Sequence, residues 1–350
     1  MDDLLKAFKE EDSRGRKQRE KPIGSRPFFM DFLTITKSKA YRRLNDKTQA
    51  FSLPEHPHIR TRASHTGEVL ANASYISESL GLNTDLCMAI AAGHDIGHVP
   101  YGHLGEKVLT SIGKKLDKKP FHHAIYSVVL AQEVEKRGRG LNLCFETLEG
   151  ILHHPVGSGK LNIDYSKPAE YHVVMFADKI SYTFADYSDA NRTGYFPKEK
   201  YAALVEKLNR TFGKETQERR EACINALIKE SRAKGRISFS EGPEFELFAE
   251  LRDTMFKEVY PIVDGELHET TLKKLYKFID TSPEFTEKYN GFDPITFISL
   301  LTDKEVTYFG HLLFKSKSIH LKDIQHFGAF ELMPELKNKK IEYWNPGLDW

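Results

Sequence analysis

Residues 93–103 read Gly-His-Asp-Ile-Gly-His-Val-Pro-Tyr-Gly-His and directly follow the apolar run 86–92. The adjacent pair His94 and Asp95 is followed by further histidines four and nine positions after His94. Imidazole nitrogen beside carboxylate oxygen suits a divalent cation of borderline to hard character, and two consecutive residues can hold such an ion only if other segments complete the shell. The stretch therefore predicts that the end of one helix meets other segments around a metal ion.

Two further segments offer the missing ligands. His65 ends the segment 60–65, which precedes the start of an amphipathic pattern at 66–69, so we expect it in the first turns of a helix. Asp178 follows the apolar run 173–177. A buried carboxylate without a partner is costly, so Asp178 requires a cation or hydrogen-bond donors nearby. We therefore expect a shell of two histidines and two aspartates that leaves positions open for water and substrate, made of His65, His94, Asp95 and Asp178.

Most of the chain follows a helical pattern, with apolar residues three and four positions apart. One such helix contains Val69, Ala73, Ile76 and Leu80 and is expected to stop at Gly81. Period-2 alternation favours strands only at 236–240 and 318–321, so the sequence predicts a mainly α fold with a minor β element. Further helices are expected over 124–135, 143–153, 171–190, 200–212, 218–229 and 244–259.

The length of 350 residues and the hydrophobic content of 40% allow one large core, and no Pro/Gly/Ser-rich tract is long enough to act as a linker. We divide this body into an N-terminal arm (1–35), a metal-binding core (36–195) and a mainly helical C-terminal region packed on that core (196–350). The segment 157–168 is rich in turn-forming residues, and we expect it to form a loop between two helices that caps a pocket.

The composition argues against several classes of function. No apolar run reaches the ~20 residues of a membrane span, and the acidic start differs from a secretory signal, so we expect a cytoplasmic protein without a membrane partner. The three cysteines are far apart and odd in number, as expected of core residues in a reducing compartment. A net charge of +1 does not indicate single-stranded nucleic acid as a partner. We interpret the basic cluster 14–21 as a mobile or oligomer-contacting arm, and the basic residues of segment 41–49 as a solvated face.

The remaining histidines are too many for one ion. A glycine and a proline break the helix after the metal pair, so His98 and His103 would face one cavity from a helix end and a loop. A histidine can contact a phosphate or donate a proton to a leaving oxygen near neutral pH. The next histidine pair opens another amphipathic helix, and we assign its functional role to His123 in preference to His122.

One face of a later helix carries polar groups at four-residue spacing, namely Asp178, Tyr182 and Asp186. This face would present a metal carboxylate, a phenol platform and an acceptor for a sugar hydroxyl, with Lys179 beside them as a cation for phosphate. The chain has no Gly-rich phosphate loop. A dication together with Arg62 and Lys179 therefore indicates an anionic substrate that is hydrolysed by metal-activated water.

The segments that carry these residues, taken in their order along the chain, resemble those of the HD superfamily of metal phosphohydrolases. Within that superfamily they resemble the deoxynucleoside triphosphate triphosphohydrolases of the dGTPase-like group. The resemblance covers roughly residues 36–195, and a weaker similarity extends to about residue 260. It implies an HD-domain helical fold with additional C-terminal helices. Six matches in the family's order are far more specific than any one of them. The matching pieces are 40–44 with 47–49, 60–65, 93–98 with 100–103, 121–123, 148–152, and 177–178 with Tyr182 and Asp186.

The resemblance also implies an activity, which is hydrolysis of a deoxynucleoside triphosphate (dNTP) to the deoxynucleoside and inorganic triphosphate. The four-residue shell would hold Mn²⁺ or Mg²⁺ in the first place, with Fe, Zn, Co or Ni as further candidates. His98, His103 and His123 would surround the α-phosphate, and His103 or His123 would protonate the 5′-oxygen. Homo-oligomeric assembly and a nucleotide activator belong to the same expectation. The implied substrate contacts are Arg62 and Lys179 to phosphate, Gln49 to the base or sugar, and Tyr182 with Asp186 to the deoxyribose.

Departures from the family pattern leave alternatives open. Residues 30–34 replace an acidic, arginine-rich block, Lys179 stands where many members have a second Asp, and residues 124–126 replace an Asn-Ala-Gln run. The alternatives are another HD phosphohydrolase, acting on a nucleoside monophosphate or a cyclic or oligonucleotide diester, and a nucleotide-binding sensor without turnover. His153 and His154 resemble the paired histidines of HD cyclic-dinucleotide phosphodiesterases, which would add a second metal, although the Gly-Tyr-Pro segment of those enzymes is absent.

Overall fold

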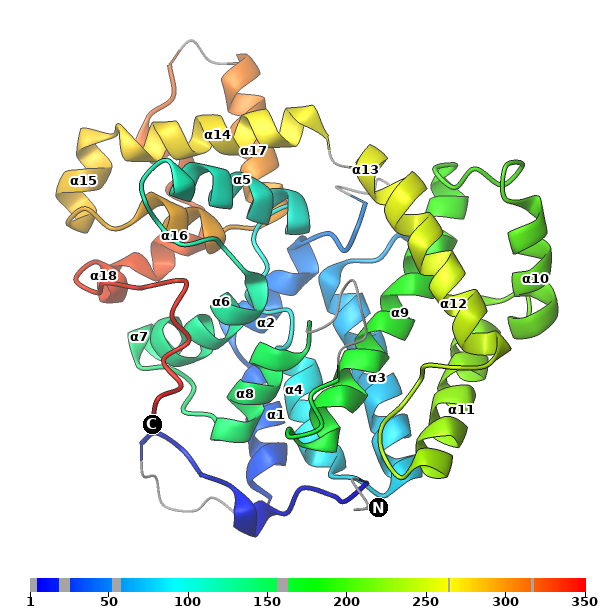
Figure 1. The fold of residues 1–350 in the computed structure, drawn as a ribbon. Helices are drawn as coiled ribbons and strands as arrows, with labels where there is room; N and C mark the ends of the chain where they lie inside the picture. Colours follow the sequence, from blue (N-terminus) through cyan, green and yellow to red (C-terminus); the bar gives the residue numbers. More distant parts are fainter. Residues whose placement is uncertain (1–4, 19–25, 52–57, 156–162, 264, 316–317) are drawn as a thin grey trace.

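The computed structural model describes residues 5–18, 26–51, 58–155, 163–263, 265–315 and 318–350, and these residues are mostly helical (Figure 1). The mainly α fold predicted from the sequence is confirmed. The first half contains α1 (Pro27–Thr36), α2 (Lys39–Arg43), α3 (Arg62–Leu80), α4 (Thr84–Gly93), α5 (Gly102–Lys114), α6 (His123–Val129), α7 (Glu135–Gly138), α8 (Phe145–His153) and α9 (Ala169–Thr193). The second half contains α10 (Ala202–Phe212), α11 (Thr216–Lys234), α12 (Pro243–Thr254), α13 (Tyr260–Val263), α14 (Glu266–Asp280), α15 (Pro283–Tyr289), α16 (Pro294–Ser299), α17 (Asp303–Lys315) and α18 (Met333–Leu336).

Local capping fixes the ends of the helices that carry the site. The Thr61 side chain accepts a hydrogen bond from the backbone N–H of Ser64, and the Ser64 side chain accepts one from the backbone of Thr61, which closes the first turn of α3. Gly81 ends α3 in the left-handed conformation with φ 67°, as predicted. Asn83 then caps α4. The pair of hydrogen bonds between Thr61 and Ser64 thus fixes the first turn of α3, which carries His65.

The helix α9 lies at the centre of the molecule, where α3, α4, α8 and α11 pack against it and bury most of its side chains. The helix α1 packs on α4, and α6 packs on α8. Two glycines allow α4 and α8 to approach closely, because a Cβ at Gly93 or Gly150 would lie 2.3 Å from an isoleucine side chain of the other helix. The close approach brings the C-terminal ends of α4 and α8 together.

The prediction of a minor β element is wrong. Within the described part of the chain, the segments 236–240 and 318–321 form no strand. The alternation in the first segment arises because Ile237 and Phe239 enter the core, while the serines between and after them hydrogen-bond to Glu230 of α11. Elsewhere in the described part of the chain, two isolated β-bridges join Arg16 to Cys144 and Thr48 to Thr61.

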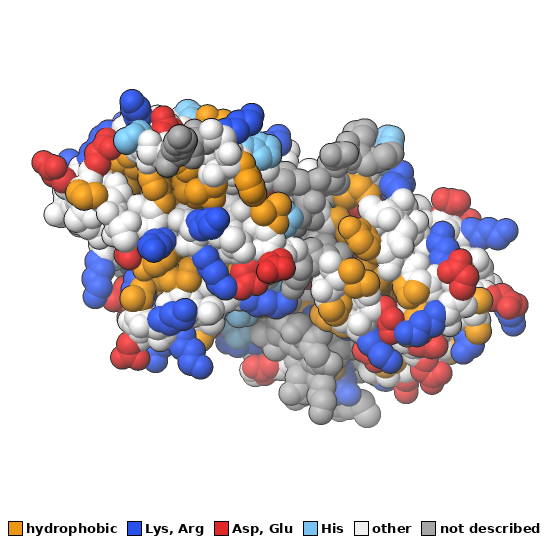
Figure 2. Space-filling view, turned by 90° about the horizontal axis from the view of Figure 1, so that it is seen from above, with side chains coloured by type: hydrophobic (Ala, Val, Ile, Leu, Met, Phe, Trp, Pro, Cys, Tyr) orange, Lys and Arg blue, Asp and Glu red, His pale blue; other side chains and the backbone are white. Residues whose placement is uncertain are grey.

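The C-terminal region lies on two sides of the central helices. Figure 1 shows α14–α17 near α5 and α18 near α7 on one side, and α10–α12 on the other. The packing of α14 on α5, of α18 on α7 and of α11 on α3 and α9 agrees with this arrangement. The surface is hollowed between the two sides (Figure 2). In the described part of the chain no helix combines the length and hydropathy needed to cross a membrane. The predicted metal ligands lie on α3, α9 and the end of α4, between the two sides.

Part of the N-terminal arm packs on the body. The backbone N–H of Phe8 donates to Glu170 of α9 at 2.9 Å, and the Ser13 hydroxyl donates to Glu146 of α8 at 2.6 Å. Residues 27–36 form α1, which contacts α4. The end of the basic cluster 14–21 and the first half of the loop 157–168 lie outside the described residues.

Candidate metal centre and active site

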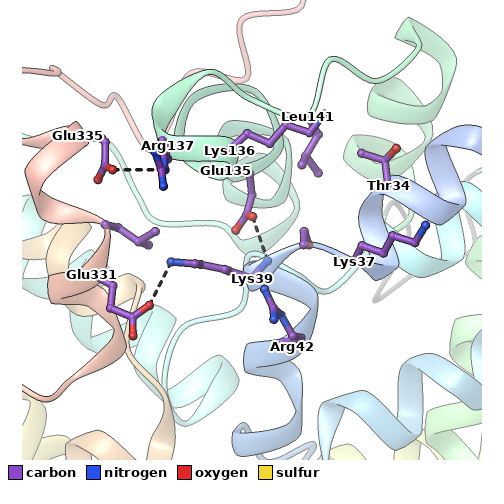
Figure 3. A pocket seen from close by; sticks show the side chains of 12 residues that line it. Thr34, Lys37, Lys39, Arg42, Glu135, Lys136, Arg137, Leu141, Glu331 and Glu335 are labelled. Atoms are coloured by element: carbon purple, nitrogen blue, oxygen red, sulfur yellow. Dashed lines mark hydrogen bonds and ion pairs between the residues drawn. The ribbon is translucent and has the colours of Figure 1, made fainter.

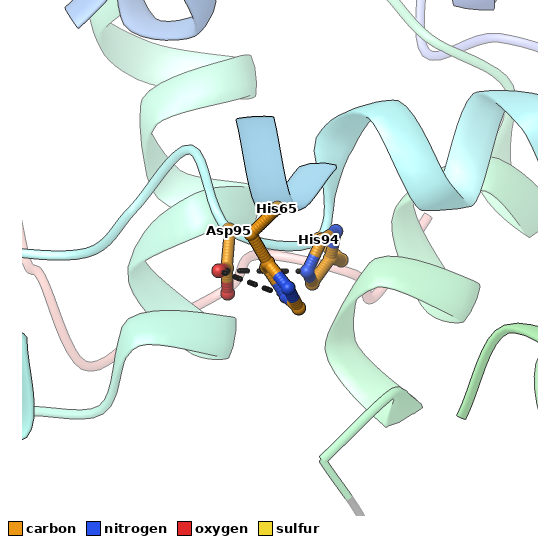
Figure 4. A group of neighbouring side chains, drawn as sticks. All are labelled: His65, His94 and Asp95. Atoms are coloured by element: carbon orange, nitrogen blue, oxygen red, sulfur yellow. Dashed lines mark ion pairs between the residues drawn. The ribbon is translucent and has the colours of Figure 1, made fainter. Parts of the chain in front are cut away.

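The end of α4 carries His94 and Asp95 to the start of α3 and the middle of α9. Asp95 Oδ2 lies 3.5 Å from His94 Nε2 and 3.9 Å from His65 Nε2, and ligand atoms of these three residues all lie within 4.8 Å of one another (Figure 4). Asp178 Oδ1 joins them, at 3.0 Å from His65 Nε2 and 3.9 Å from His94 Nε2. The structure therefore brings together all four residues of the expected shell.

The tautomer of His94 shows that this donor set fits a cation. Its Nδ1 lies 2.7 Å from the backbone carbonyl of Ala91 and must carry the proton, because a carbonyl oxygen only accepts. The lone pair is then on Nε2, which is buried and has no hydrogen-bond partner among the described residues. A metal-ligating histidine typically donates its other ring N–H in this way. Two imidazoles and two carboxylates at these distances suit a divalent metal ion.

Both carboxylates are held in the ionised form that a metal requires. Burial opposes ionisation of Asp95, but two neighbouring histidines and Arg62 outweigh it and hold its pKa well below the usual range. Arg62 Nη1 lies 2.7 Å from Asp95 Oδ2. Burial likewise opposes ionisation of Asp178, and the hydrogen bond and charge of His65 lower its pKa nevertheless. The pair therefore supplies two negative charges at the centre.

The helix α6 holds the turn that follows Asp95. The Ser127 hydroxyl accepts from the Gly97 N–H at 2.9 Å and donates to the His94 carbonyl at 3.0 Å. A Cβ at Gly97 would lie 2.2 Å from the Ser127 nitrogen and 2.5 Å from the His123 carbonyl oxygen, which are backbone atoms that cannot move aside. The turn and α6 are therefore in direct contact, and this contact brings His123 to the cluster.

A carboxylate that the sequence analysis missed organises the histidines. The rings of His98 and His123 stack with centroids 3.9 Å apart, and Glu106 Oε1 lies 2.6 Å from His123 Nδ1 and 3.5 Å from His98 Nδ1. Burial works against ionised Glu106, but His123 and its neighbours outweigh it and hold the pKa of Glu106 well below the usual range. Glu106 follows His103 by three residues on α5, so helical spacing would have indicated it.

His103 differs from the other two histidines in exposure. Its side chain is 70% exposed, and its Nδ1 lies 3.7 Å from Glu106 Oε2. Partial desolvation works against a charged imidazole here, but the hydrogen bond and charge of Glu106 raise the pKa of His103. Burial and Arg62 instead lower the pKa of His98 well below its usual range. His103 is thus the solvent-facing member of the group and carries a proton more readily than His98.

Each histidine pair of the sequence sends one member into the cluster. His123 enters it, whereas His122 caps α6 by accepting from a backbone N–H at 3.3 Å. His154 at the end of α8 enters it, with Nε2 3.3 Å from His123 Nε2, whereas His153 stacks on a tyrosine of α9. Burial, followed by two neighbouring histidines, lowers the pKa of His154 to about 3. His154 is therefore uncharged in the cluster.

The helix α9 carries the residues expected at the sugar and phosphates. The Tyr182 hydroxyl accepts from Arg252 Nη2 at 2.9 Å, and Asp186 Oδ2 accepts from the Tyr260 hydroxyl at 2.9 Å. Asp186 Oδ1 is buried without a hydrogen-bond partner in the described structure, and burial raises the pKa of Asp186 to about 7. Burial lowers the pKa of Lys179 to about 8. One oxygen of Asp186 thus remains open to a donor.

Gln49 is linked to the metal cluster through Arg62. The backbone carbonyl of Gln49 accepts from Arg62 Nη2 at 3.2 Å, while the other arm of Arg62 pairs with Asp95. The side-chain oxygen of Gln49 is buried and has no hydrogen-bond partner among the residues described. Arg62 therefore pairs with one of the predicted metal ligands, in addition to the phosphate role expected for it.

The basic segment 41–49 is not simply a solvated face. Arg42 is exposed, but Lys47 is buried and its ammonium donates to the carbonyl of His98. Burial, followed by the charge of Arg43, lowers the pKa of Lys47 to about 7. The prediction of a solvated side chain was wrong for Lys47, because the sequence did not show that this segment contacts the loop that begins at His98.

Asp303, at the start of α17, joins two segments of the site. One of its oxygens accepts from the Thr48 N–H at 2.9 Å and the Thr48 hydroxyl at 2.6 Å, and the other accepts from the Tyr101 N–H at 2.9 Å. Tyr101 has the left-handed φ of 60°. The C-terminal region thereby ties the segment that ends in Gln49 to the loop that leads to His103.

We expect Asp303→Ala to lower the free energy of unfolding by about 2–4 kcal/mol, because two buried backbone N–H groups lose their acceptor. Urea unfolding followed by circular dichroism measures the loss. Asp253→Ala, on the exposed face of α12, is the matched control and should stay within about 0.5 kcal/mol of the parent. Equal stability of the two variants would contradict the tie that Asp303 forms.

A separate cavity of about 540 Å³ lies beside α2 and α7 (Figure 3). Five basic side chains and three carboxylates line it, and two of the basic side chains form ion pairs with carboxylates there. Glu135 accepts from the backbone of Lys39 at 3.0 Å, Lys39 pairs with Glu331 at 3.1 Å, and Arg137 pairs with Glu335 at 3.6 Å. None of the predicted site residues lines this cavity, so it is distinct from the metal cluster.

Comparisons with known proteins agree with this geometry. The model of the HD domain family matches residues 62–190, which include the whole four-residue shell. A deoxyguanosinetriphosphate triphosphohydrolase-like protein of Clostridium tetani is 39% identical over 259 residues, covering 72% of each chain. Proteins of the same name from Caldanaerobacter subterraneus (39% over 257 residues, 73% of this chain and 71% of the relative) and Desulfatibacillum aliphaticivorans (35% over 274 residues, 73% of each) are also similar. The chain therefore belongs to the HD-domain family of deoxyguanosinetriphosphate triphosphohydrolase-like proteins.

Proposed function

We propose that this protein hydrolyses a dNTP, with a divalent metal, to the deoxynucleoside and inorganic triphosphate. One observation carries the proposal, namely that a four-residue metal cluster lies next to a separate acid pair, His103 and Glu106. Phosphoester hydrolysis by water requires both an activated nucleophile and a proton for the leaving oxygen. The names of the relatives support a nucleoside triphosphate as the substrate.

The metal shell supplies the nucleophile half of the reaction. A divalent cation held by His65, His94, Asp95 and Asp178, for which we propose Mn²⁺ or Mg²⁺, would act as a Lewis acid that lowers the pKa of a water molecule and polarises a phosphoryl oxygen. The two ionised carboxylates balance its charge. Arg62, which pairs with Asp95, places a fixed positive charge where negative charge develops on the α-phosphate.

His103 supplies the proton in this mechanism. The water oxygen bonds to the α-phosphorus, the bond from that phosphorus to the 5′-oxygen breaks, and the 5′-oxygen takes the proton of His103. Glu106 stabilises the charged imidazole before the transfer. His98 and His123 flank the α-phosphate in the proposal, but they are buried and their nitrogens face Glu106, Asp95 or His154, so His103 is the better donor.

The helix α9 would bind the deoxyribose. Asp186 Oδ1 is an open acceptor for the 3′-hydroxyl, and the ring of Tyr182 would pack on the sugar and exclude a 2′-hydroxyl by steric clash. Lys179 would contact the phosphates, and Gln49, with its open side-chain oxygen, would contact the base or the sugar.

Asp186→Ala is expected to lower kcat/KM for the preferred dNTP by roughly 10- to 100-fold, because the 3′-hydroxyl loses its hydrogen-bond acceptor in a buried environment. The same variant should leave kcat/KM for the corresponding 2′,3′-dideoxynucleotide nearly unchanged, because that substrate has no 3′-hydroxyl. Tyr260→Phe is the matched control, since it removes the contact to Asp186 Oδ2 and leaves Oδ1 in place. An equal loss with both substrates would indicate a general defect instead of a sugar contact.

Product analysis tests the proposed reaction. The purified protein is incubated with each of the four dNTPs and with GTP, in Mn²⁺ and in Mg²⁺, and the products are separated by chromatography. Deoxynucleoside and intact triphosphate are expected. If no single dNTP reacts, dNTP mixtures test the need for a nucleotide activator. Turnover restricted to nucleoside monophosphates or diesters, or tight dNTP binding without triphosphate release, would replace the proposal by one of the alternatives.

A further inference from the structure

We propose that the protein binds a second divalent metal ion between His123 and His154, with Asp95 as a ligand shared with the first ion. The proposal goes beyond the proposed function, because it does not depend on which substrate is hydrolysed. It rests on the hydrogen bonds that orient the two imidazoles, on the distance between them and on the position of Asp95 beside both.

His154 is oriented in the same way as the first-site ligand His94. Each follows the last residue of a helix, α8 or α4, and each places Nδ1 2.7 Å from the backbone carbonyl three residues earlier. A carbonyl oxygen only accepts, so Nδ1 of each ring carries the proton and Nε2 carries the lone pair. The two rings lie edge to face with centroids 5.1 Å apart. Both helix ends thus direct a lone pair into the same cluster.

The lone pair of His123 points toward that of His154. Glu106 Oε1 accepts from the backbone N–H of His123 at 3.2 Å and lies 2.6 Å from His123 Nδ1, so this oxygen acts as an acceptor and Nδ1 also carries the proton. A carboxylate on the outer nitrogen of a histidine is the usual second partner of a metal ligand. In the neutral rings, two lone pairs therefore face each other across 3.3 Å in a buried environment. Such a contact is repulsive unless a cation lies between the nitrogens.

The distance between the two nitrogens fits a metal ion. Nitrogen ligands about 2.0–2.1 Å from one tetrahedral ion lie about 3.4 Å apart, close to the observed 3.3 Å. Hydrogen bonds of a nitrogen donor are shorter and centre on about 2.9–3.0 Å. A ligand oxygen of Asp95 lies within 4.8 Å of ligand nitrogens of both His123 and His154, which gives the ion a third ligand. Asp95 belongs to the first cluster as well, so it would bridge two ions.

The competing account places a proton, not a metal, between the two rings. His123 would then be charged, held by Glu106 on one side and donating to His154 on the other. The two accounts differ in the number of ions bound. Two imidazoles and one carboxylate suit Zn²⁺ and Mn²⁺, so these two ions are suitable probes.

Metal stoichiometry decides between them. The full-length protein is stripped with chelator, dialysed separately against excess Mn²⁺ and Zn²⁺, and analysed by inductively coupled plasma mass spectrometry without substrate. We expect about two equivalents for the parent and about one for His154→Gln. His153→Gln is the matched control, since its ring stacks on Tyr171 outside the cluster, and it should keep two.

The electron paramagnetic resonance spectrum of the Mn²⁺-loaded protein provides a second measurement. Two manganese ions that share Asp95 should show exchange coupling, which His154→Gln should abolish while one uncoupled ion remains. A parent protein that never binds more than one equivalent of either metal would overturn the proposal. So would a His154→Gln protein that binds as much metal as the parent. Because the parent measurement is decisive by itself and uses no substrate, it holds if the variant folds poorly and if no dNTP is hydrolysed.

Discussion

Asp178→Ala is expected to lose the first metal ion and to lower kcat by at least about 10³-fold, because a bound cation contributes several kcal/mol to the stabilisation of the transition state. Asp178 Oδ1 is the carboxylate oxygen closest to His65 Nε2, at 3.0 Å, and its removal leaves only three residues of the shell. Metal analysis of the purified protein and steady-state turnover of the preferred dNTP measure the two effects. His94→Ala should have the same result, since Nε2 of His94 has no other partner in the described structure.

The control for this prediction is Asp253→Ala, which removes an exposed carboxylate of α12 that is not a member of the shell. It should retain the metal content and the kcat of the parent. If Asp178→Ala kept full activity, the proposed shell would be wrong. If it kept the metal but lost activity, Asp178 would instead act on the substrate or on the water.

The second large effect is expected for His103→Gln, which should bind metal normally and lower kcat by about 10²- to 10⁴-fold, the usual contribution of a general acid. The parent should lose activity as pH rises through the pKa of His103, since the proton donor disappears, and Glu106 raises that pKa above the ordinary value. This alkaline decline should be absent in the variant. The pH dependence of kcat measures both effects.

A substrate with a better leaving group separates proton donation from a structural role. A nucleotide p-nitrophenyl ester releases an oxygen that needs no proton, so His103→Gln should slow its hydrolysis much less than that of a dNTP. His122→Gln is the matched control, because His122 caps α6 and lies outside the acid pair. Equal slowing of both substrates, with an unchanged pH profile, would contradict the assignment of His103 as the acid.

Local sequence patterns predicted much of the helical framework. The start of α3 near His65, its stop at Gly81 and the apolar core of α9 follow from capping residues and three- and four-residue spacing, which act over one or two turns. The segment 236–240 shows the limit of such reasoning. Its alternation is real, but the polar residues bind Glu230 of the neighbouring helix and not a second strand, and periodicity does not identify the partner.

The sequence by itself determined the helical fold, the family and the four donor residues that the structure gathers at the centre, because the chemistry of a His-Asp pair and the spacing of its neighbours are local properties. Only the tertiary structure revealed the roles of His154, Lys47 and Asp303 and the contact of Glu106 with His123. Each of these acts on a segment distant in the chain, as when Asp303 binds the backbone of Thr48 across 255 positions. Such contacts depend on how helices pack, and packing follows from the shape and burial of many side chains together, which no short stretch of sequence specifies.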